Sequence, residues 1–153
     1  MGLLAKQVIK RLVECGCTHF ISGMAMGFDT WVAEDVLLLK RANKALTLKC
    51  TIPFPDQAKS WNDAYRKRRE VILSKADMIT QVSQSYNRGW FHERTRYMVD
   101  RADVVVCAYN GQKGGTAYTV DYALKQDKIV IQIDPATANV SIISRRRFER
   151  YIE

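Results

Sequence analysis

The stretch Val104-Val-Val-Cys-Ala-Tyr-Asn-Gly-Gln-Lys-Gly-Gly-Thr116 decides the fold, because a glycine loop joins an apolar run to a helical pattern. The five apolar residues of Val104–Ala108 predict a strand that is buried on both faces. Gly114 and Gly115 allow the backbone to approach a ligand closely, and Thr116 is the predicted cap of the next helix. The first-turn N–H groups of such a helix attract anions. The junction therefore predicts an anion site, and the alternative is an ordinary strand-to-helix turn without a ligand.

Strand and helix patterns alternate along the whole chain, with no hairpin signal between alternating runs. This order predicts an α/β protein with a Rossmann-like, mostly parallel sheet and helices on both faces. Ligands bind such sheets beyond the carboxyl ends of the strands. We expect strands near His19–Ile21, Leu46–Ile52, Met78–Val82, Val104–Ala108 and Ile129–Ile133, and helices near Leu3–Glu14, after Asp29 to about Arg41, near Ser60–Lys75, near His92–Arg101 and from Thr116 onward.

Length and composition predict one domain over residues 1–153, because 153 residues with 47% hydrophobic content are enough for one core. No apolar run approaches the roughly 20 residues of a membrane span, and residues 1–10 lack the apolar centre of a secretory signal. The four cysteines lack a zinc-binding spacing and are expected to be reduced. His19 and His92 suggest no metal site. We therefore expect a cytoplasmic protein without a membrane partner.

The formal charge of +8 is concentrated in two basic clusters, Arg66–Arg69 and Arg145–Arg150. A basic protein attracts polyanions, so nucleic acid is a candidate partner. Four consecutive basic residues wrap around a helix, however, and do not form one stripe. A solvated helix face is therefore the favoured interpretation of the first cluster.

A second glycine loop, Ser22-Gly-Met-Ala-Met-Gly-Phe-Asp29, also leads directly into a helix. Gly23 and Gly27 have no side chain and Ala25 has a small one, so a ligand can approach the backbone of this loop closely. Asp29 either accepts hydrogen bonds from a ribose hydroxyl or stabilises the N-terminus of its own helix. The spacing matches neither the dinucleotide fingerprint nor a P-loop, so hydrolysis of nucleoside triphosphates has no support. Two such loops at one sheet edge predict a shared pocket.

Four motifs follow one another along the chain: Ser-Gly-Met-Ala-Met-Gly-Phe-Asp from Ser22, Ile-Pro-Phe-Pro-Asp-Gln-Ala-Lys-Ser-Trp from Ile52, Arg-Thr-Arg-Tyr-Met-Val-Asp from Arg94, and Gly-Gly-Thr-Ala-Tyr-Thr from Gly114. Together they resemble the YpsA-like branch of the SLOG superfamily, which also contains the SMF/DprA DNA-processing proteins and the LOG phosphoribohydrolases. The resemblance covers nearly the whole chain. It implies a Rossmann-like fold whose glycine loops bind a nucleotide or an ADP-ribose-like ligand, and it leaves the reaction undecided.

The resemblance also implies which residues contact this ligand. A planar guanidinium fork suits phosphate oxygens, although Arg94 and Arg96 alternatively form surface ion pairs with Glu93 or Asp100. The Gln57 amide can form hydrogen bonds to a base, and the Trp61 indole can stack on it. Alternatively, Trp61 anchors its helix in the core. The implied ligand-binding residues are Ser22, Gly23, Met24, Ala25, Gly27 and Asp29 in the first loop, Gln57 and Trp61 for the base, and Arg94, Arg96, Asn110, Gly114, Gly115 and Thr116 for phosphate.

Two departures from the family pattern limit the inference. LOG enzymes carry a catalytic glutamate shortly after the Gly-Gly loop, whereas this chain reads Ala117-Tyr-Thr-Val120 there. Phosphoribohydrolase activity is therefore not expected, and no catalytic residue is assigned. Relatives also begin with a strand and a Thr-Gly-His-Arg loop, which this sequence lacks before its first helix. We expect a rearranged sheet, completion of the sheet by a partner chain in a homo-oligomer, or a reading frame that begins too late.

Three functions remain open at this point. The first is a nucleotide-binding or nucleotide-sensing protein that is not clearly catalytic. The second is a hydrolase of a nucleotide N-glycosidic or phosphate bond, in which Asp29, Asp100 or Asp121 provides the carboxylate. The third is a DprA-like single-stranded DNA-binding protein that uses basic residues and exposed aromatic side chains such as Tyr86 and Trp90.

Overall fold

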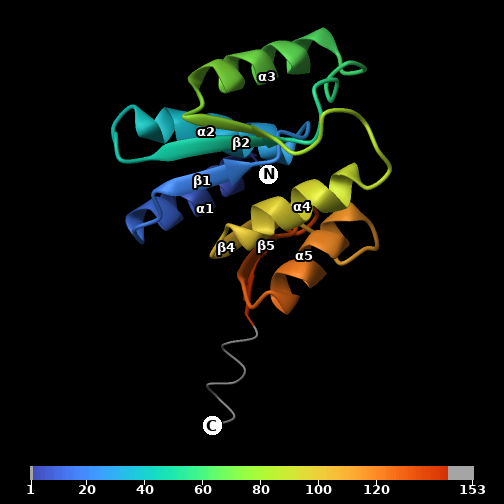
Figure 1. The fold of residues 1–153 in the computed structure, drawn as a ribbon. Helices are drawn as coiled ribbons and strands as arrows, with labels where there is room; N and C mark the ends of the chain where they lie inside the picture. Colours follow the sequence, from blue (N-terminus) through green and yellow to red (C-terminus); the bar gives the residue numbers. More distant parts are fainter. Residues whose placement is uncertain (1, 145–153) are drawn as a thin grey trace. The chain divides into compact units, whose positions relative to one another are not determined.

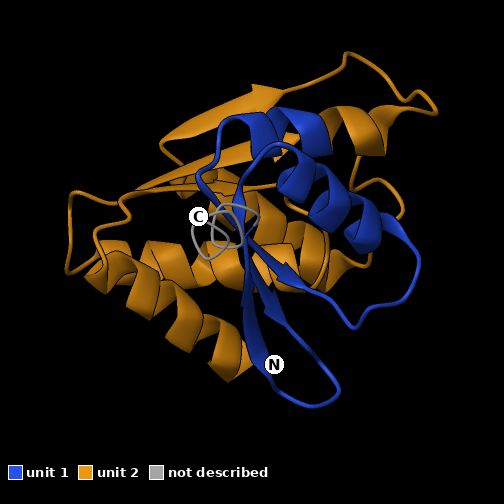
Figure 2. Ribbon diagram, turned by 90° about the horizontal axis from the view of Figure 1, so that it is seen from below, with its two compact units in different colours: residues 1, 95–153 blue, residues 2–94 orange. Residues whose placement is uncertain are grey.

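The computed structural model describes residues 2–144. These residues form an N-terminal unit of residues 2–94 and a C-terminal unit that starts at Thr95 (Figure 2). The N-terminal unit contains α1 (Gly2–Glu14), β1 (His19–Ser22), α2 (Phe28–Lys40), β2 (Thr47–Ile52), α3 (Asp63–Lys75), β3 (Met78–Gln81) and the start of α4 (Trp90–Asp100) (Figure 1). The C-terminal unit contains the rest of α4 and then β4 (Val104–Ala108), α5 (Gly115–Lys125), β5 (Ile129–Ile133) and β6 (Val140–Ile143).

The N-terminal unit has a parallel three-stranded sheet in the order β1-β2-β3. In its register Ser22 is the partner of Cys50, which brings the start of the first glycine loop beside the middle of the sheet. Ile9 of α1, Val36 of α2 and Ile72 of α3 are buried in one hydrophobic cluster with alternate residues of β2. Burial of these side chains holds the three helices on the sheet, at about 1.5–3 kcal/mol for each fully buried aliphatic side chain.

Local signals set the ends of these helices. Gly16 ends α1, because this residue has φ +99° and its N–H donates to the carbonyl of Val13 at 3.0 Å. Asn62 caps α3, with its side-chain oxygen accepting a hydrogen bond from the N–H of Tyr65 at 2.9 Å. Ser60 and Trp61 therefore precede α3, although the sequence pattern had placed them inside the helix.

The C-terminal unit has a sheet in the order β4-β5-β6. β4 and β5 are parallel, and β5 and β6 are antiparallel. The sequence analysis missed β6 and the hairpin before it. Asp134 stabilises that turn, because its Oδ1 accepts hydrogen bonds from the N–H groups of Ala136 at 2.8 Å and Thr137 at 3.4 Å. Asp134-Pro135 thus starts a hairpin as well as ending a strand.

One face of this second sheet packs against helices. Cys107 of β4 and Val130 of β5 share a buried cluster with Val99 of α4, Val120 and Ala123 of α5. Together the two units confirm the predicted α/β class, with a Rossmann-like, mostly parallel strand arrangement and flanking helices. Across residues 2–144, no helix has the length and apolar character that crossing a membrane requires.

Candidate functional site

The first glycine loop is held by hydrogen bonds among its own residues. The N–H of Met24 donates to Ser22 Oγ at 3.2 Å, and the N–H of Ala25 donates to Asp29 Oδ2 at 3.2 Å. Thr30 Oγ1 donates to the carbonyl of Ala25 at 2.9 Å. Two amides that a bound phosphate would use therefore already have acceptors within the loop.

Met24 holds the centre of this loop in an unusual conformation. It has φ +60°, a region that residues with a side chain visit rarely, and its side chain is 0% exposed. Such a conformation costs on the order of 1 kcal/mol and persists only where the surroundings enforce it. Burial of the thioether in the core provides that enforcement.

Arg94 lies inside the N-terminal unit. Its Nη1 donates to the carbonyl of Gly23 at 2.9 Å, and its guanidinium lies 5.1 Å from the ring centre of Trp90 and 5.7 Å from that of Phe91. The residue is 6% exposed. Burial lowers the pKa of Arg94, and the charge of Asp29 opposes that shift. Arg94 thus braces the first loop and does not form the surface ion pair that was the alternative prediction.

Asp29 is the acid of this loop. Burial raises the pKa of the Asp29 carboxyl, while the charge of Arg94 and the hydrogen bond from Ala25 lower it. The carboxyl group reaches back to the loop from the first turn of α2, and α2 has no side-chain cap. Of the two predicted roles, its bond to Ala25 supports stabilisation of the loop and helix start.

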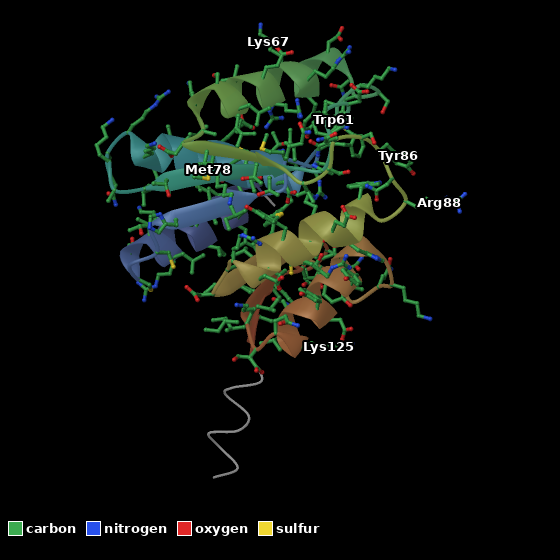
Figure 3. The ribbon with its side chains drawn as sticks, in the orientation of Figure 1. Trp61, Lys67, Met78, Tyr86, Arg88 and Lys125 are labelled. Carbon is green, nitrogen blue, oxygen red and sulfur yellow. The ribbon has the colours of Figure 1, made fainter. Side chains whose placement is uncertain are left out.

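Gln57 also contacts the first loop, whereas Trp61 lies before α3. Gln57 Nε2 donates to the carbonyls of Gly23 at 3.4 Å and Met24 at 3.3 Å. These bonds fix the orientation of the amide, and among residues 2–144 its Oε1 is buried without a hydrogen-bond partner. Trp61 is half-buried next to the cap residue Asn62 (Figure 3).

The second glycine loop has a different construction. Gly114 is the cap residue of α5, with φ +151° and no side-chain hydrogen bond. Thr116 is the second residue of the helix, so the predicted capping role of Thr116 is wrong. The correction has a physical reason, since a positive φ at the cap favours glycine over threonine. Asn110 Oδ1 accepts a hydrogen bond from the N–H of Gln112 at 3.0 Å and shapes the start of the loop.

Arg96 of α4 contacts Tyr118, the fourth residue of α5. Its Nη1 and the hydroxyl oxygen of Tyr118 are 3.2 Å apart, and the N–H of Tyr118 donates to the carbonyl of Gly114 at 3.2 Å. The residue is exposed. Tyr122 follows one turn later and donates to Asp100 Oδ1 at 2.7 Å, a hydrogen bond that raises the pKa of Tyr122. The structure thus brings Arg96 together with the N-terminal end of α5.

A hollow of about 280 Å³ opens at the carboxyl ends of β4 and β5 in the C-terminal unit. The sequence analysis included Asn110 but missed the other polar residues that line it. The available signal was their position, since Asp134 directly follows a predicted strand and ligands gather at such ends. The lining consists of Tyr109, Asn110, Gly111, Gln132, Asp134, Asn139 and Ser141.

Ion pairs neutralise two of the four basic residues in the cluster on α3. Arg66 pairs with Asp63, and Arg68 pairs with Glu34 while lying 4.9 Å from the ring centre of Tyr65. Burial lowers the pKa of Arg69, whose Nε is buried without a partner among the described residues. Lys67 projects outward from α3 (Figure 3). The cluster Arg145–Arg150 lies outside the described residues.

Thiols and histidines provide no metal centre in the described part of the chain. Within residues 2–144 no three His, Cys, Asp or Glu side chains gather as a metal site would require. All four cysteines are free thiols, and burial raises the pKa of Cys50 and of Cys107 to about 12. His19 Nδ1 lies 2.7 Å from Thr47 Oγ1, a contact between β1 and β2.

Each unit therefore gathers part of the predicted ligand-binding set. In the N-terminal unit, Gly23 and Met24 are in contact with Gln57, and Gly23 also with Arg94. In the C-terminal unit, Arg96 contacts the hydroxyl of Tyr118, whose N–H bonds to the carbonyl of Gly114. A ligand shared by both loops remains a prediction.

Comparisons with known proteins identify relatives of this chain and the family to which it belongs. A UPF0398 protein of Halalkalibacterium halodurans is 29% identical over 126 residues, which cover 80% of this chain and 67% of the relative. The SPbeta prophage-derived protein YoqJ of Bacillus subtilis is 27% identical over 119 residues, 70% of each chain. Neither name states a ligand or a reaction. The sequence pattern of the YspA SLOG family matches residues 3–136, so the chain belongs to that family.

Proposed function

We propose that this protein binds and senses a nucleotide or nucleotide derivative, such as an ADP-ribose-like molecule, through its phosphate. The observation that carries the proposal is the contact of the Arg96 guanidinium with the side chain of Tyr118 on α5, a helix with a glycine cap and no side-chain acceptor at its start. Membership of the SLOG family adds support.

The physical chemistry of this helix start favours a phosphate. The first N–H groups of a helix lack intrahelical partners and carry partial positive charge. Asn62 supplies a capping oxygen to α3, whereas Gly114 has no side chain and supplies none to α5. A phosphate oxygen can take its place, and a guanidinium adds charge-assisted hydrogen bonds worth about 1.5–3 kcal/mol each.

Binding has more support than hydrolysis. The first turn of α5 contains Gly115, Thr116 and Ala117, and no carboxylate occupies the position where LOG enzymes carry glutamate. Asp29 already accepts a loop amide, and Asp121 pairs with Lys125 at 3.0 Å. The carboxylates considered for acid or base chemistry thus have internal partners, with Asp100 bonded to Tyr122.

Single-stranded DNA binding has less support than nucleotide binding. The Arg66 and Arg68 guanidiniums would have to leave Asp63 and Glu34 before they could contact a nucleic-acid backbone. On a DNA-binding face, Lys and Arg side chains contact the phosphates and release the counterions of the nucleic acid.

We also propose a cytoplasmic location, because free thiols fit a reducing compartment.

Thermal unfolding with a panel of nucleoside mono- and diphosphates and ADP-ribose tests the proposal. A ligand present at 100 times its Kd stabilises the folded state by about 2.7 kcal/mol, which raises Tm by several degrees. Arg96→Gln should weaken binding about tenfold or more. Arg101→Gln is the matched control, since Arg101 is exposed near the end of the same helix and bonds the carbonyl of Tyr97 at 3.0 Å.

Two results would overturn the proposal. One is an unchanged Tm with every member of the panel, in protein that unfolds cooperatively. The other is equal loss of binding in Arg96→Gln and Arg101→Gln, which would indicate a nonspecific response to net charge.

A further inference from the structure

We propose that the hollow at the carboxyl ends of β4 and β5 binds the sugar hydroxyls of a ligand whose phosphate occupies the N-terminal end of α5, so that the ligand class is a ribose phosphate or a compound containing one. This inference rests on the proposed function. It specifies the chemistry next to the phosphate.

The sheet register places the hollow on the same face as α5. Cys107 of β4, which packs with Val120 and Ala123 of α5, is the register partner of Gln132. Gln132 is in turn the partner of Ser141 on β6. Residues that are register partners point to the same face of a sheet, so Gln132 and Ser141 lie on the α5 side.

The loop after β4 belongs to both sites. Tyr109, Asn110 and Gly111 line the hollow, and four residues after Asn110 the same loop reaches the α5 cap at Gly114. The N–H of Tyr109 donates to the carbonyl of Ile133 at 3.0 Å, which ties the loop to β5 beside the hollow. Four residues span at most about 14 Å when extended, so this loop sets an upper limit of about that length on the separation of the two sites.

The lining suits neutral hydroxyl groups. The carboxamides of Gln132 and Asn139 each offer donors and an acceptor, and the Ser141 hydroxyl offers both. Asp134 uses Oδ1 for the hairpin turn, and its carboxylate can accept hydrogen bonds from sugar hydroxyls through the other oxygen. A carboxylate in this position is the arrangement that binds ribose hydroxyls in dinucleotide sites.

Charge and size assign the two ends of the ligand. Asp134 repels a phosphate from the hollow, and the lining contains no Lys or Arg, whereas Arg96 of α4 contacts Tyr118 of α5. Pockets for drug-sized ligands occupy about 300–1,000 Å³. The hollow of about 280 Å³ therefore fits a single sugar and is small for a dinucleotide.

Calorimetric titration with ribose 5-phosphate and with ethyl phosphate tests the inference, because the second probe has the anion without the hydroxyls. We expect the native protein to bind ribose 5-phosphate about tenfold or more tightly than ethyl phosphate. Gln132→Leu should reduce this preference to about threefold or less and leave the affinity for ethyl phosphate unchanged. Gln126→Leu, at the exposed far end of α5, makes the same chemical change and should preserve the preference.

The outcomes separate this inference from the proposed function. Equal affinity of the native protein for both probes overturns the sugar site and leaves the phosphate site standing, provided that Arg96→Gln weakens both. Should only full nucleotides bind, Gln132→Leu must weaken the tightest of them at least threefold, and unchanged affinity overturns the inference. If no phosphate compound binds, the proposed function itself fails.

Should Gln132→Leu fail to fold, Asn139→Leu provides the second test, since Asn139 is exposed at the rim of the hollow. The same loss of preference is expected from that variant. A preference that survives in Asn139→Leu under these conditions counts against the sugar site.

Discussion

The loops at Ser22–Asp29 and Asn110–Thr116 have the same local design, yet their polar groups are used differently. Each follows a strand and leads to a helix whose cap is a glycine with positive φ, Gly27 at +84° and Gly114 at +151°. The first loop supplies its own acceptors and is braced by a buried arginine. Beside the second, exposed Arg96 contacts Tyr118 of the helix that follows. Similar glycine loops can thus differ in how much of their polar surface is used in internal bonds.

The largest expected effect is in thiol chemistry, where the buried cysteine of each region should differ from an exposed one. Cys50 lies beside Ser22 of the first loop, and Cys107 lies in the strand before the second. Burial raises the pKa of both thiols to about 12, so each should react with a disulfide reagent about a hundredfold or more slowly than exposed Cys15. Labelling followed by mass spectrometry checks this.

The same experiment compares the two loops. Local opening should expose Cys107 before Cys50, because Cys50 is 0% exposed on the central strand β2, whereas Cys107 is 7% exposed on the edge strand β4. Labelling in a Cys15→Ser, Cys17→Ser background isolates the two buried thiols. Faster reaction of Cys50 would contradict the comparison.

The two arginines of α4 should differ next most strongly. Arg94→Met keeps most of the side-chain volume but removes the charged donor to Gly23, and we expect a loss of about 2 kcal/mol in the free energy of unfolding. Arg96→Met should change it by about 0.5 kcal/mol or less, because Arg96 is exposed. Urea titration of both variants measures these values, and equal losses would refute the assigned roles.

The caps provide a smaller test. Asn62→Ala should destabilise the fold by about 1 kcal/mol, because α3 loses the acceptor for the N–H of Tyr65. Ser60→Ala, two residues earlier at an exposed position, should have almost no effect. Added phosphate should stabilise Asn62→Ala and the native protein by the same amount, since the anion site is assigned to α5. A larger gain in Asn62→Ala would mean that the open start of α3 also binds the ion.

The smallest expected effect is a pH dependence of the free energy of unfolding that comes from Asp29 in the first loop. Burial raises the pKa of Asp29 in the folded state above the ordinary value of 3.8. The folded state therefore binds the proton more tightly than the unfolded state, and stability falls as pH rises from 3.8 through the raised pKa. In Asp29→Asn this slope should disappear. Urea midpoints across acidic pH test it, and an unchanged slope would show that another group is responsible.

Much of the fold follows from sequence pattern. The strands Val104–Ala108 and Ile129–Ile133 have the predicted ends, because continuous apolar runs bounded by turn residues leave little choice. β6 escaped prediction because its pattern is short and its pairing depends on the Asp134 turn. The sequence motif also predicted the same phosphate-binding role for Arg94 and Arg96. With about 3.6 residues per helical turn, residues two apart face nearly opposite sides, and only packing decides which side is buried.

The sequence by itself determined the order of strands and helices, the two glycine loops and membership of the SLOG family, since these depend on periodicity and local backbone chemistry. Tertiary structure decided which polar groups are buried in internal bonds and which stay exposed. It turned Arg94 and Asp29 inward to the first loop, placed Arg96 against Tyr118 of α5, and lined a hollow with Gln132 and Asn139. Those outcomes depend on contacts between residues far apart in the chain, and a one-dimensional pattern does not contain them.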